Sequence, residues 1–136
     1  MYSSIVEMRV KYGETDSMGY LYYGNYALYY EVGRTELIRD LGFSYKELEE
    51  KGIMMPVVEY RSKYVRPALY DDILTIKTSL RDFPKGKKIT FYTELFNEKK
   101  QRLNTGFVIL VFVDKRSGKT TGLPPILKEK LTPFFD

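Results

Sequence analysis

The residues best suited to chemistry lie close together, between residues 12 and 39 of the chain. Asp16 stands in a glycine-rich loop, residues 12–19, just before a stretch with a helical pattern. The start of a helix carries unpaired backbone N–H groups and the positive end of the helix dipole. A carboxylate there can attack a carbonyl while these N–H groups stabilise the oxyanion that forms. Spacing alone favours a simpler role for Asp16, as the acceptor of an Asx turn or a helix cap.

Two residue types are missing from the chain, and their absence narrows the chemistry. The 136 residues include no cysteine and no histidine. This excludes disulfides, a cysteine nucleophile, Cys/His zinc sites, serine–histidine relays and a histidine general base. Proton transfer or nucleophilic attack is left to Asp, Glu, Lys, Tyr or a Ser–Lys pair. We therefore expect no transition-metal site, and any metal would need an oxygen cage.

Length and composition predict one domain over residues 1–136, since 43% of the residues are hydrophobic. No apolar run approaches the roughly 20 residues of a membrane-spanning helix. The N-terminus lacks the basic and apolar regions of a secretory signal, so we expect a cytoplasmic protein. The net charge of +4 is compatible with anionic ligands, although the basic clusters at residues 85–88 and 99–102 are more typical of exposed hairpin tips.

The hydrophobic pattern predicts two helices in the first half of the chain. After a strand at residues 5–12 and a loop at 13–21, a long helix is expected from Gly24 to Leu41. Its buried face should contain Tyr26, Tyr30, Gly33, Leu37 and Leu41, with Ala27 and Ile38 beside them. Ser44 and Glu47 have capping-box spacing for a short second helix that ends near Lys51.

The second half of the chain is predicted to be mainly β-structure. Strands are expected at residues 56–66, 72–83, 87–97 and 103–114, joined in succession by tight turns. The run at 107–113 is apolar on both faces, which is typical of a central strand. A short helix with proline in its first turn is expected in the tail, between residues 123 and 131. An antiparallel sheet packed against one long helix therefore forms the predicted α+β fold.

The same residues resemble a known family. Residues 12–19, 22–26 and 34–36 resemble the 4-hydroxybenzoyl-CoA thioesterases, hotdog-fold enzymes that include the Tol–Pal-associated acyl-CoA thioesterases. Residues 63–68 and 71–74 resemble the strand and turn after the helices of that family. The resemblance implies a sheet of about five strands wrapped around the long helix. It also implies dimers that assemble further into tetramers, and hydrolysis of acyl- or aroyl-CoA thioesters at the dimer interface without metal or prosthetic group.

The resemblance also implies the roles of two residues. Asp16 matches the catalytic aspartate of the family, and with this match we favour catalysis over a purely structural role. Tyr23 matches the position whose backbone N–H polarises the thioester carbonyl. Many members have histidine there, whereas the benzoyl-type branch has tyrosine. Asp16 would act as nucleophile or as general base, and the sequence leaves both routes open.

Further residues are candidates for substrate binding. Gly19 and Gly24 would let the substrate approach the backbone closely. The acyl pocket is assigned to Tyr22, Tyr26 and Met54. Coenzyme A is expected only as part of the substrate, not as a separate cofactor. Its phosphates are expected to bind to Arg61, Lys63, Arg66, Lys87 and Lys88. Ordinary turn, core and surface roles compete with each of these assignments.

Other functions remain open from the sequence. A hydratase on the same fold would rely on a histidine that this chain lacks. A non-catalytic module could bind acyl-CoA, or could bind single-stranded nucleic acid by stacking and phosphate contacts. The aromatic residues gather on the predicted helix rather than on strand faces, so we expect no nucleic-acid partner. A structural dimer with a decayed site is the last alternative.

Overall fold

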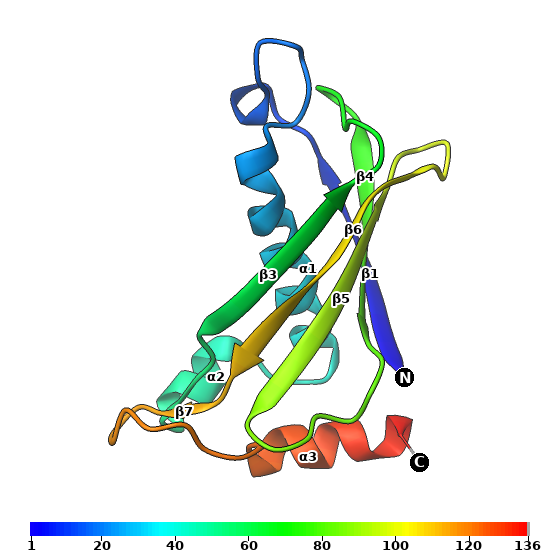
Figure 1. Cartoon of the computed structure of the whole chain (residues 1–136). Helices are drawn as coiled ribbons and strands as arrows, with labels where there is room; N and C mark the ends of the chain where they lie inside the picture. The colour runs from blue at the N-terminus through cyan, green and yellow to red at the C-terminus, as the bar shows by residue number, and fades with distance from the viewer. Residues whose placement is uncertain (136) are drawn as a thin grey trace.

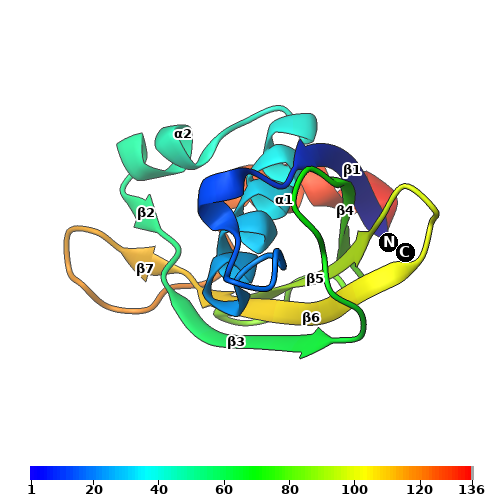
Figure 2. The same cartoon turned by 90° about the horizontal axis from the view of Figure 1, so that it is seen from above.

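The long helix is α1 (Tyr26–Asp40), and one antiparallel sheet curves around it (Figures 1 and 2). The structure is a computed structural model that describes residues 1–135. The five strands of the sheet, in spatial order, are β1 (Tyr2–Arg9), β4 (Ile73–Leu80), β5 (Lys88–Phe96), β6 (Arg102–Val111) and β3 (Val57–Tyr64). This is the α+β hotdog arrangement that the resemblance implied.

Smaller elements close the ends of this framework. The short helix α2 (Tyr45–Glu50) begins as predicted, with the Ser44 hydroxyl accepting from the Glu47 backbone N–H at 3.2 Å. The tail forms α3 (Pro125–Leu131), also as predicted. A second sheet, which the sequence did not predict, pairs β2 (Ile53–Met54) with β7 (Val113–Asp114). Single 3₁₀ turns cover Tyr12–Glu14, Tyr23–Asn25 and Thr132–Phe134. No helix among residues 1–135 is long and apolar enough to span a membrane.

The predicted succession of four hairpin-linked strands is wrong at its first step. β4–β5 and β5–β6 are hairpin pairs, but β3 pairs with β6 and lies at the far edge of the sheet. The connection from β3 to β4 is a long loop that is held by the N-terminal half of the chain, since Ala68 O accepts from Leu21 N at 2.8 Å. Alternation of side chains predicts which residues form a strand. It does not predict which strands become neighbours.

Side-chain alternation on β4 and β5 was predicted correctly. Leu74, Ile76 and Leu80 are fully buried beneath α1, and Ile89, Phe91 and Leu95 follow the same rule on β5. β6 lies between β5 and β3, as expected for a run that is apolar on both faces. The first strand, however, covers residues 2–9 rather than 5–12, because a 3₁₀ turn begins at Tyr12.

One side of α1 differs from the prediction. Ala27 is exposed, whereas Tyr29 and Arg34 are buried with the expected residues. The reason is the position of the helix, which packs mainly against β1 and β4. The side of α1 that faces β3 is therefore less covered, and Ala27 and Leu28 lie there beside a small cavity.

Two contacts fix α1 against the sheet. At Gly33, an added Cβ would lie 2.2 Å from Thr78 Oγ1 and 2.8 Å from Ile76 Cγ2, so only glycine allows the helix to approach β4 this closely. The Tyr30 hydroxyl donates to the buried Asn104 Oδ1, and Asn104 Nδ2 donates to Ser62 Oγ at 2.9 Å. This chain of hydrogen bonds joins α1 to β6 and to β3.

The Gly33 contact gives a stability prediction. Gly33→Ala should gain about 1 kcal/mol of helix propensity but lose more through overpacking against β4, which costs about 1–3 kcal/mol. We expect a net loss of up to about 2 kcal/mol in the free energy of unfolding, measured by urea denaturation. Gly122→Ala, where no atom lies within 4 Å of the added Cβ, is the matched control. An unchanged midpoint for Gly33→Ala would contradict the close contact.

Candidate active site

The loop that contains Asp16 is held against α1 by Glu14. Glu14 Oε1 accepts from the Lys11 backbone N–H at 2.9 Å and from the Tyr29 hydroxyl at 2.7 Å. Its backbone oxygen accepts from Tyr22 N and from Asn25 Nδ2, each at 2.9 Å. Both ends of the loop are thereby tied to one residue. The sequence analysis assigned no role to Glu14, although its spacing of three from Lys11 is that of a carboxylate returning to the start of a turn.

One oxygen of the Asp16 carboxylate accepts backbone hydrogen bonds, and the other accepts none within residues 1–135. Its Oδ1 accepts from Met18 N at 2.9 Å and Tyr20 N at 3.2 Å, which is the Asx turn that spacing alone favoured. Gly19 closes the turn with a positive φ of 76°. Within residues 1–135, no hydrogen bond reaches Oδ2, and Asp16 lines a cavity. The Asx turn therefore orients the carboxylate and leaves one oxygen for a ligand.

The helix start lies beside the same cavity. Neither the Tyr23 nor the Gly24 backbone N–H donates a hydrogen bond to any group in the described part of the chain. Tyr23 lines the cavity together with Asp16. At Gly24, an added Cβ would lie 2.6 Å from the Tyr22 ring, so the backbone here packs directly under an aromatic side chain. Tyr23, whose backbone N–H is unbonded within residues 1–135, and Asp16, whose Oδ2 is likewise unbonded, thus line the same cavity.

The cavity itself has a volume of about 330 Å³ and is mainly apolar. It is lined by Asp16, Met18, Tyr20, Leu21, Tyr23, Tyr26, Tyr64, Val65, Arg66 and Pro67. The Tyr26 and Tyr64 rings meet edge to face at 5.0 Å, which joins the helix start to the end of β3. One wall of this cavity was not predicted at Tyr64, Val65 and Pro67, because these residues lie about fifty positions beyond Asp16 in the chain. Within the same wall, Arg66 had been assigned from the sequence to the phosphates of coenzyme A.

The predicted substrate-binding residues are brought together only in part. Tyr26 lines the Asp16 cavity, while Gly19, Tyr22 and Gly24 shape the surrounding backbone without lining it. Met54 lies in β2, next to α2 (Figure 2), and α2 lies at the opposite end of the molecule from the loop before α1 (Figure 1). Within one chain, Met54 is therefore not part of the Asp16 cavity.

The five basic residues assigned to phosphates are also scattered. Arg66 lines the Asp16 cavity and a neighbouring cavity of about 360 Å³. Arg61 and Lys63 are both exposed on β3. Lys87 and Lys88 lie where β5 begins, at the opposite end of the sheet from the Asp16 loop (Figure 1).

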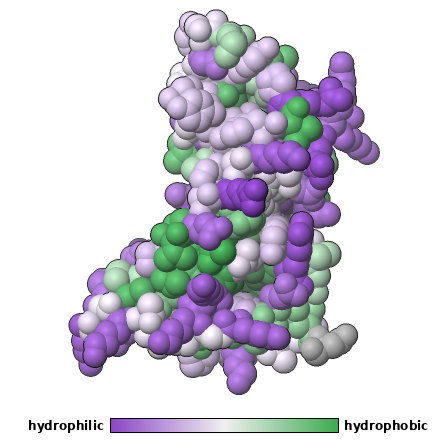
Figure 3. Space-filling model, viewed as in Figure 1, coloured by the Kyte–Doolittle hydropathy of each residue, from purple (hydrophilic) through white to green (hydrophobic). Residues whose placement is uncertain are grey.

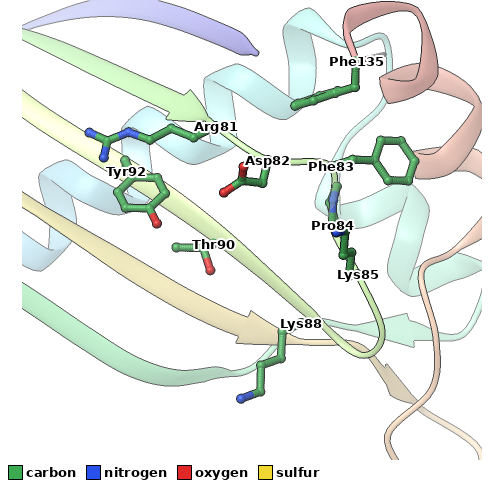
Figure 4. Close-up of a pocket in the computed structure, with 9 residues that line it drawn as sticks. All are labelled: Arg81, Asp82, Phe83, Pro84, Lys85, Lys88, Thr90, Tyr92 and Phe135. Carbon is green, nitrogen blue, oxygen red and sulfur yellow. The ribbon is translucent and has the colours of Figure 1, made fainter.

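Lys88 belongs to a second, larger cavity of about 530 Å³ (Figure 4). Arg81 and Lys85 line it as well, so three cations face one carboxylate, that of Asp82. The Arg81 guanidinium lies 3.9 Å from the centre of the Tyr92 ring, which holds it in place on the outer face of the sheet. Of these three cations, Lys88 was assigned from the sequence to phosphate binding, whereas Arg81 and Lys85 were not. This cavity has the charge to bind an anion.

The edge strand β3 is the most exposed strand of the main sheet. It pairs only with β6, and seven of its eight residues are exposed. Val57 and Val58 are 48% and 56% exposed, and Figure 3 shows apolar surface over the start of β3 and the end of β6. A long apolar edge with unpaired backbone groups is a surface that natural proteins usually cover.

The chain is similar to known proteins in both sequence and structure. The family model described as "Thioesterase-like superfamily" matches residues 10–131. A Bacillus subtilis protein named "Putative acyl-CoA thioesterase YneP" is 37% identical over 119 residues, which is 88% of this chain and 86% of that protein. The "Acyl-CoA thioester hydrolase YbgC" of Escherichia coli is 32% identical over 117 residues, 86% of this chain and 87% of that protein. A crystal structure of a DHNA-CoA thioesterase from Staphylococcus aureus matches with a TM-score of 0.92 and 33% identity, and covers 98% of this chain and 91% of that one.

The bond between Tyr29 and Glu14 gives a prediction with a defined pH dependence. Burial, together with the hydrogen bond to Glu14, raises the pKa of Tyr29 above its usual value of 10. Tyr29→Phe should lower the free energy of unfolding by about 1.5–3 kcal/mol at pH 8, because a hydrogen bond to a charged group is lost. Tyrosine in the unfolded chain ionises first as the pH rises, so the native protein loses this stabilisation above pH 10, at about 1.4 kcal/mol per pH unit.

The cost of Tyr29→Phe should therefore shrink between pH 8 and pH 11. Denaturant titrations at both values measure it, with Tyr12→Phe as the control because Tyr12 is 78% exposed. An equal cost at the two pH values would contradict the assigned state of Tyr29.

Proposed function

Since this chain belongs to the thioesterase-like superfamily, we propose that it is a hydrolase that converts an acyl- or aroyl-CoA thioester to the free acid and coenzyme A. One observation carries the proposal. Asp16, whose Oδ2 accepts no hydrogen bond within residues 1–135, and Tyr23, whose backbone N–H at the helix start donates none there, line the same apolar cavity. The named activities of the B. subtilis and E. coli relatives support it.

The geometry supports a division of roles. The thioester carbonyl would lie over the start of the helical segment and accept from the Tyr23 N–H, with the Gly24 N–H beside it. These donors and the helix dipole stabilise the negative charge that develops on the oxygen. Each such donor typically lowers the activation barrier by about 3 kcal/mol. The donors are rigid, because Glu14 fixes the chain on both sides of them.

Asp16 would act through Oδ2 by one of two routes. As nucleophile, it attacks the carbonyl carbon and the coenzyme A thiolate leaves, which gives a mixed anhydride that water then hydrolyses. As general base, it takes a proton from a water molecule that attacks the same carbon, and the C–S bond of the resulting tetrahedral intermediate then breaks to release the coenzyme A thiolate and the free acid. Each step uses only groups of the protein and water, so the proposal includes no cofactor, and coenzyme A enters only with the substrate. The cytoplasmic location stays a prediction.

We also propose that the working unit is a homodimer that pairs along β3. Pairing would cover the exposed edge of β3 and its apolar side chains. When a two-fold axis pairs two β3 strands antiparallel, the two sheets run in opposite directions, so opposite ends of the two sheets lie side by side. This arrangement brings the basic cavity around Lys85 and Lys88 of one protomer to the same end as the Asp16 cavity of its partner. The phosphates of coenzyme A would then bind at that end, and Arg66 would add a charge from the Asp16 side. Assembly of two such dimers into a tetramer stays a prediction.

The catalytic proposal is tested by thiol release from short, medium, long and aromatic acyl-CoAs. Asp16→Asn removes the charge and the nucleophile but keeps the shape, so kcat should fall by about 10² to 10⁴-fold. Asp40→Asn, at the exposed end of α1, is the control and should keep full activity. Equal turnover by the native chain and Asp16→Asn would refute the assignment. If the native chain binds acyl-CoA but releases no thiol, the protein is a binding module, and salt-sensitive oligonucleotide binding would indicate a nucleic-acid module instead.

The dimer proposal is tested by sedimentation equilibrium. The native protein should have at least twice the chain mass of 16.0 kDa. Val58→Asp places a charge on the exposed edge and should weaken the dimer by at least tenfold in Kd, since an interface disfavours an unpaired buried charge. Ile5→Asp is the matched control, because Ile5 is 65% exposed on β1 at the opposite edge of the sheet. A native monomer, or dissociation by the control variant alone, would exclude pairing through β3.

A further inference from the structure

Two cavities lie between α1 and the edge strand β3, on the less covered side of the helix. The Asp16 cavity, of about 330 Å³, is lined by Tyr26 from α1 and by Tyr64 from the end of β3. The second cavity, of about 180 Å³, is lined by residues of α1 and by Val57 and Tyr60 of β3. Since the same helix and the same strand line both cavities, the two cavities follow one another along these elements.

Four tyrosine rings, which we call the tyrosine partition, stand between the two cavities. Tyr26 meets Tyr64 edge to face, with ring centres 5.0 Å apart and an interplanar angle of 83°. Tyr30 meets Tyr60 in the same way, at 5.2 Å and 77°. Tyr60 and Tyr64 share one face of β3, because side chains alternate along a strand. The two ring pairs therefore lie one behind the other between α1 and β3.

The two halves of the tyrosine partition differ in burial. Tyr26 and Tyr30 are 3% and 1% exposed, so the helix rings are part of the core. Tyr64 is 49% exposed, and its hydroxyl donates to the Tyr23 backbone oxygen at 3.4 Å. Tyr64 is therefore the ring that borders the Asp16 cavity and can be replaced without opening the core.

The proposed function gives the partition a consequence for the substrate, and the inference rests on that function. With the thioester carbon at Asp16, the adjoining apolar cavity is the space that receives the acyl group. A short acyl group fits there and leaves both ring pairs intact. A longer chain reaches the contact between Tyr26 and Tyr64, and it must separate these rings to enter the second cavity. Separation loses the favourable edge-to-face contact of the buried Tyr26 ring.

We propose that Tyr64 is a specificity-determining residue that limits the length of the acyl group. Its ring ends the acyl cavity against Tyr26, so CoA thioesters of short linear acids are preferred over those of long-chain fatty acids. Without the Tyr64 ring, the cavity beside Tyr60 becomes an extension of the Asp16 cavity. Both rings belong to one chain, so the limit does not require the β3 dimer.

The test compares hexanoyl-CoA with dodecanoyl-CoA, each below its critical micelle concentration. The native protein should favour hexanoyl-CoA by about tenfold or more in kcat/KM, because the longer chain must displace a ring. Tyr64→Val, which keeps a strand-forming residue, should raise kcat/KM for dodecanoyl-CoA by about tenfold. A gain on the longer substrate is a result that loss of stability does not produce.

Two control variants separate the ring from its other effects. Tyr64→Phe keeps the ring but loses the hydrogen bond to the Tyr23 oxygen, and it should retain the native ratio of the two substrates. Tyr70→Val should retain this ratio as well, because Tyr70 is 52% exposed and is not among the residues that line either cavity within residues 1–135.

Several outcomes would overturn the assignment. Equal kcat/KM of the native protein for the two substrates would show that no length limit exists. An equal fall for both substrates in Tyr64→Val would make Tyr64 a structural residue. The same change of ratio in Tyr64→Phe as in Tyr64→Val would assign the limit to the hydroxyl instead of the ring. A change of ratio that accompanies dissociation in sedimentation would assign it to the second copy.

Failure of the proposed function is distinguishable from failure of this inference. If the native chain releases no thiol from either substrate, the hydrolase proposal fails, and calorimetric binding of the same two acyl-CoAs decides the inference. Tighter binding of hexanoyl-CoA, lost in Tyr64→Val and kept in Tyr64→Phe, would support the length limit. Equal binding, or tighter binding of dodecanoyl-CoA by the native protein, would refute it.

Discussion

The burial of α1 in the concave face of one curved sheet is the constraint on which the rest of the structure depends. The helix can approach β4 only because Gly33 has no side chain to meet Thr78 and Ile76. The buried Tyr30–Asn104–Ser62 hydrogen bonds then fix the same helix relative to β6 and β3. Since α1 lies closer to β1 and β4 than to β3, its two sides differ. One side is the core of the domain, and the other side faces an uncovered strand.

The candidate active site is a consequence of how this helix begins. Glu14 accepts hydrogen bonds from Tyr29 on the helix and from both ends of the loop, so the loop and the helix start behave as one unit. The Asx turn at Asp16 does not compete with a chemical role. It uses Oδ1 to orient the carboxylate and leaves Oδ2 at the cavity. The structural and the catalytic interpretations of Asp16 therefore describe two oxygens of one side chain.

The uncovered side of α1 and the scattered basic residues have a common explanation in the proposed dimer. A single chain has the Asp16 cavity and the basic cavity around Lys88 at opposite ends of the sheet, since the loop before α1 and the start of β5 lie at opposite ends (Figure 1). It also has an exposed edge strand with apolar side chains at its start. Each of these features is unfavourable or incomplete in one chain. Antiparallel pairing of β3 would place complementary halves beside one another, which is the usual property of an isologous interface.

The sequence by itself determined the local elements and the chemical class of the site. Periodicity identified the helices and the main strands, because side-chain alternation follows directly from backbone geometry. The lack of cysteine and histidine restricted the chemistry, and the motif around Asp16 indicated the family. The tertiary structure decided the position of β3 beside β6, the anchoring role of Glu14, and the wall formed by Tyr64 and Val65. These depend on which distant segments meet, and that choice is made by packing of the whole chain, which local patterns do not encode.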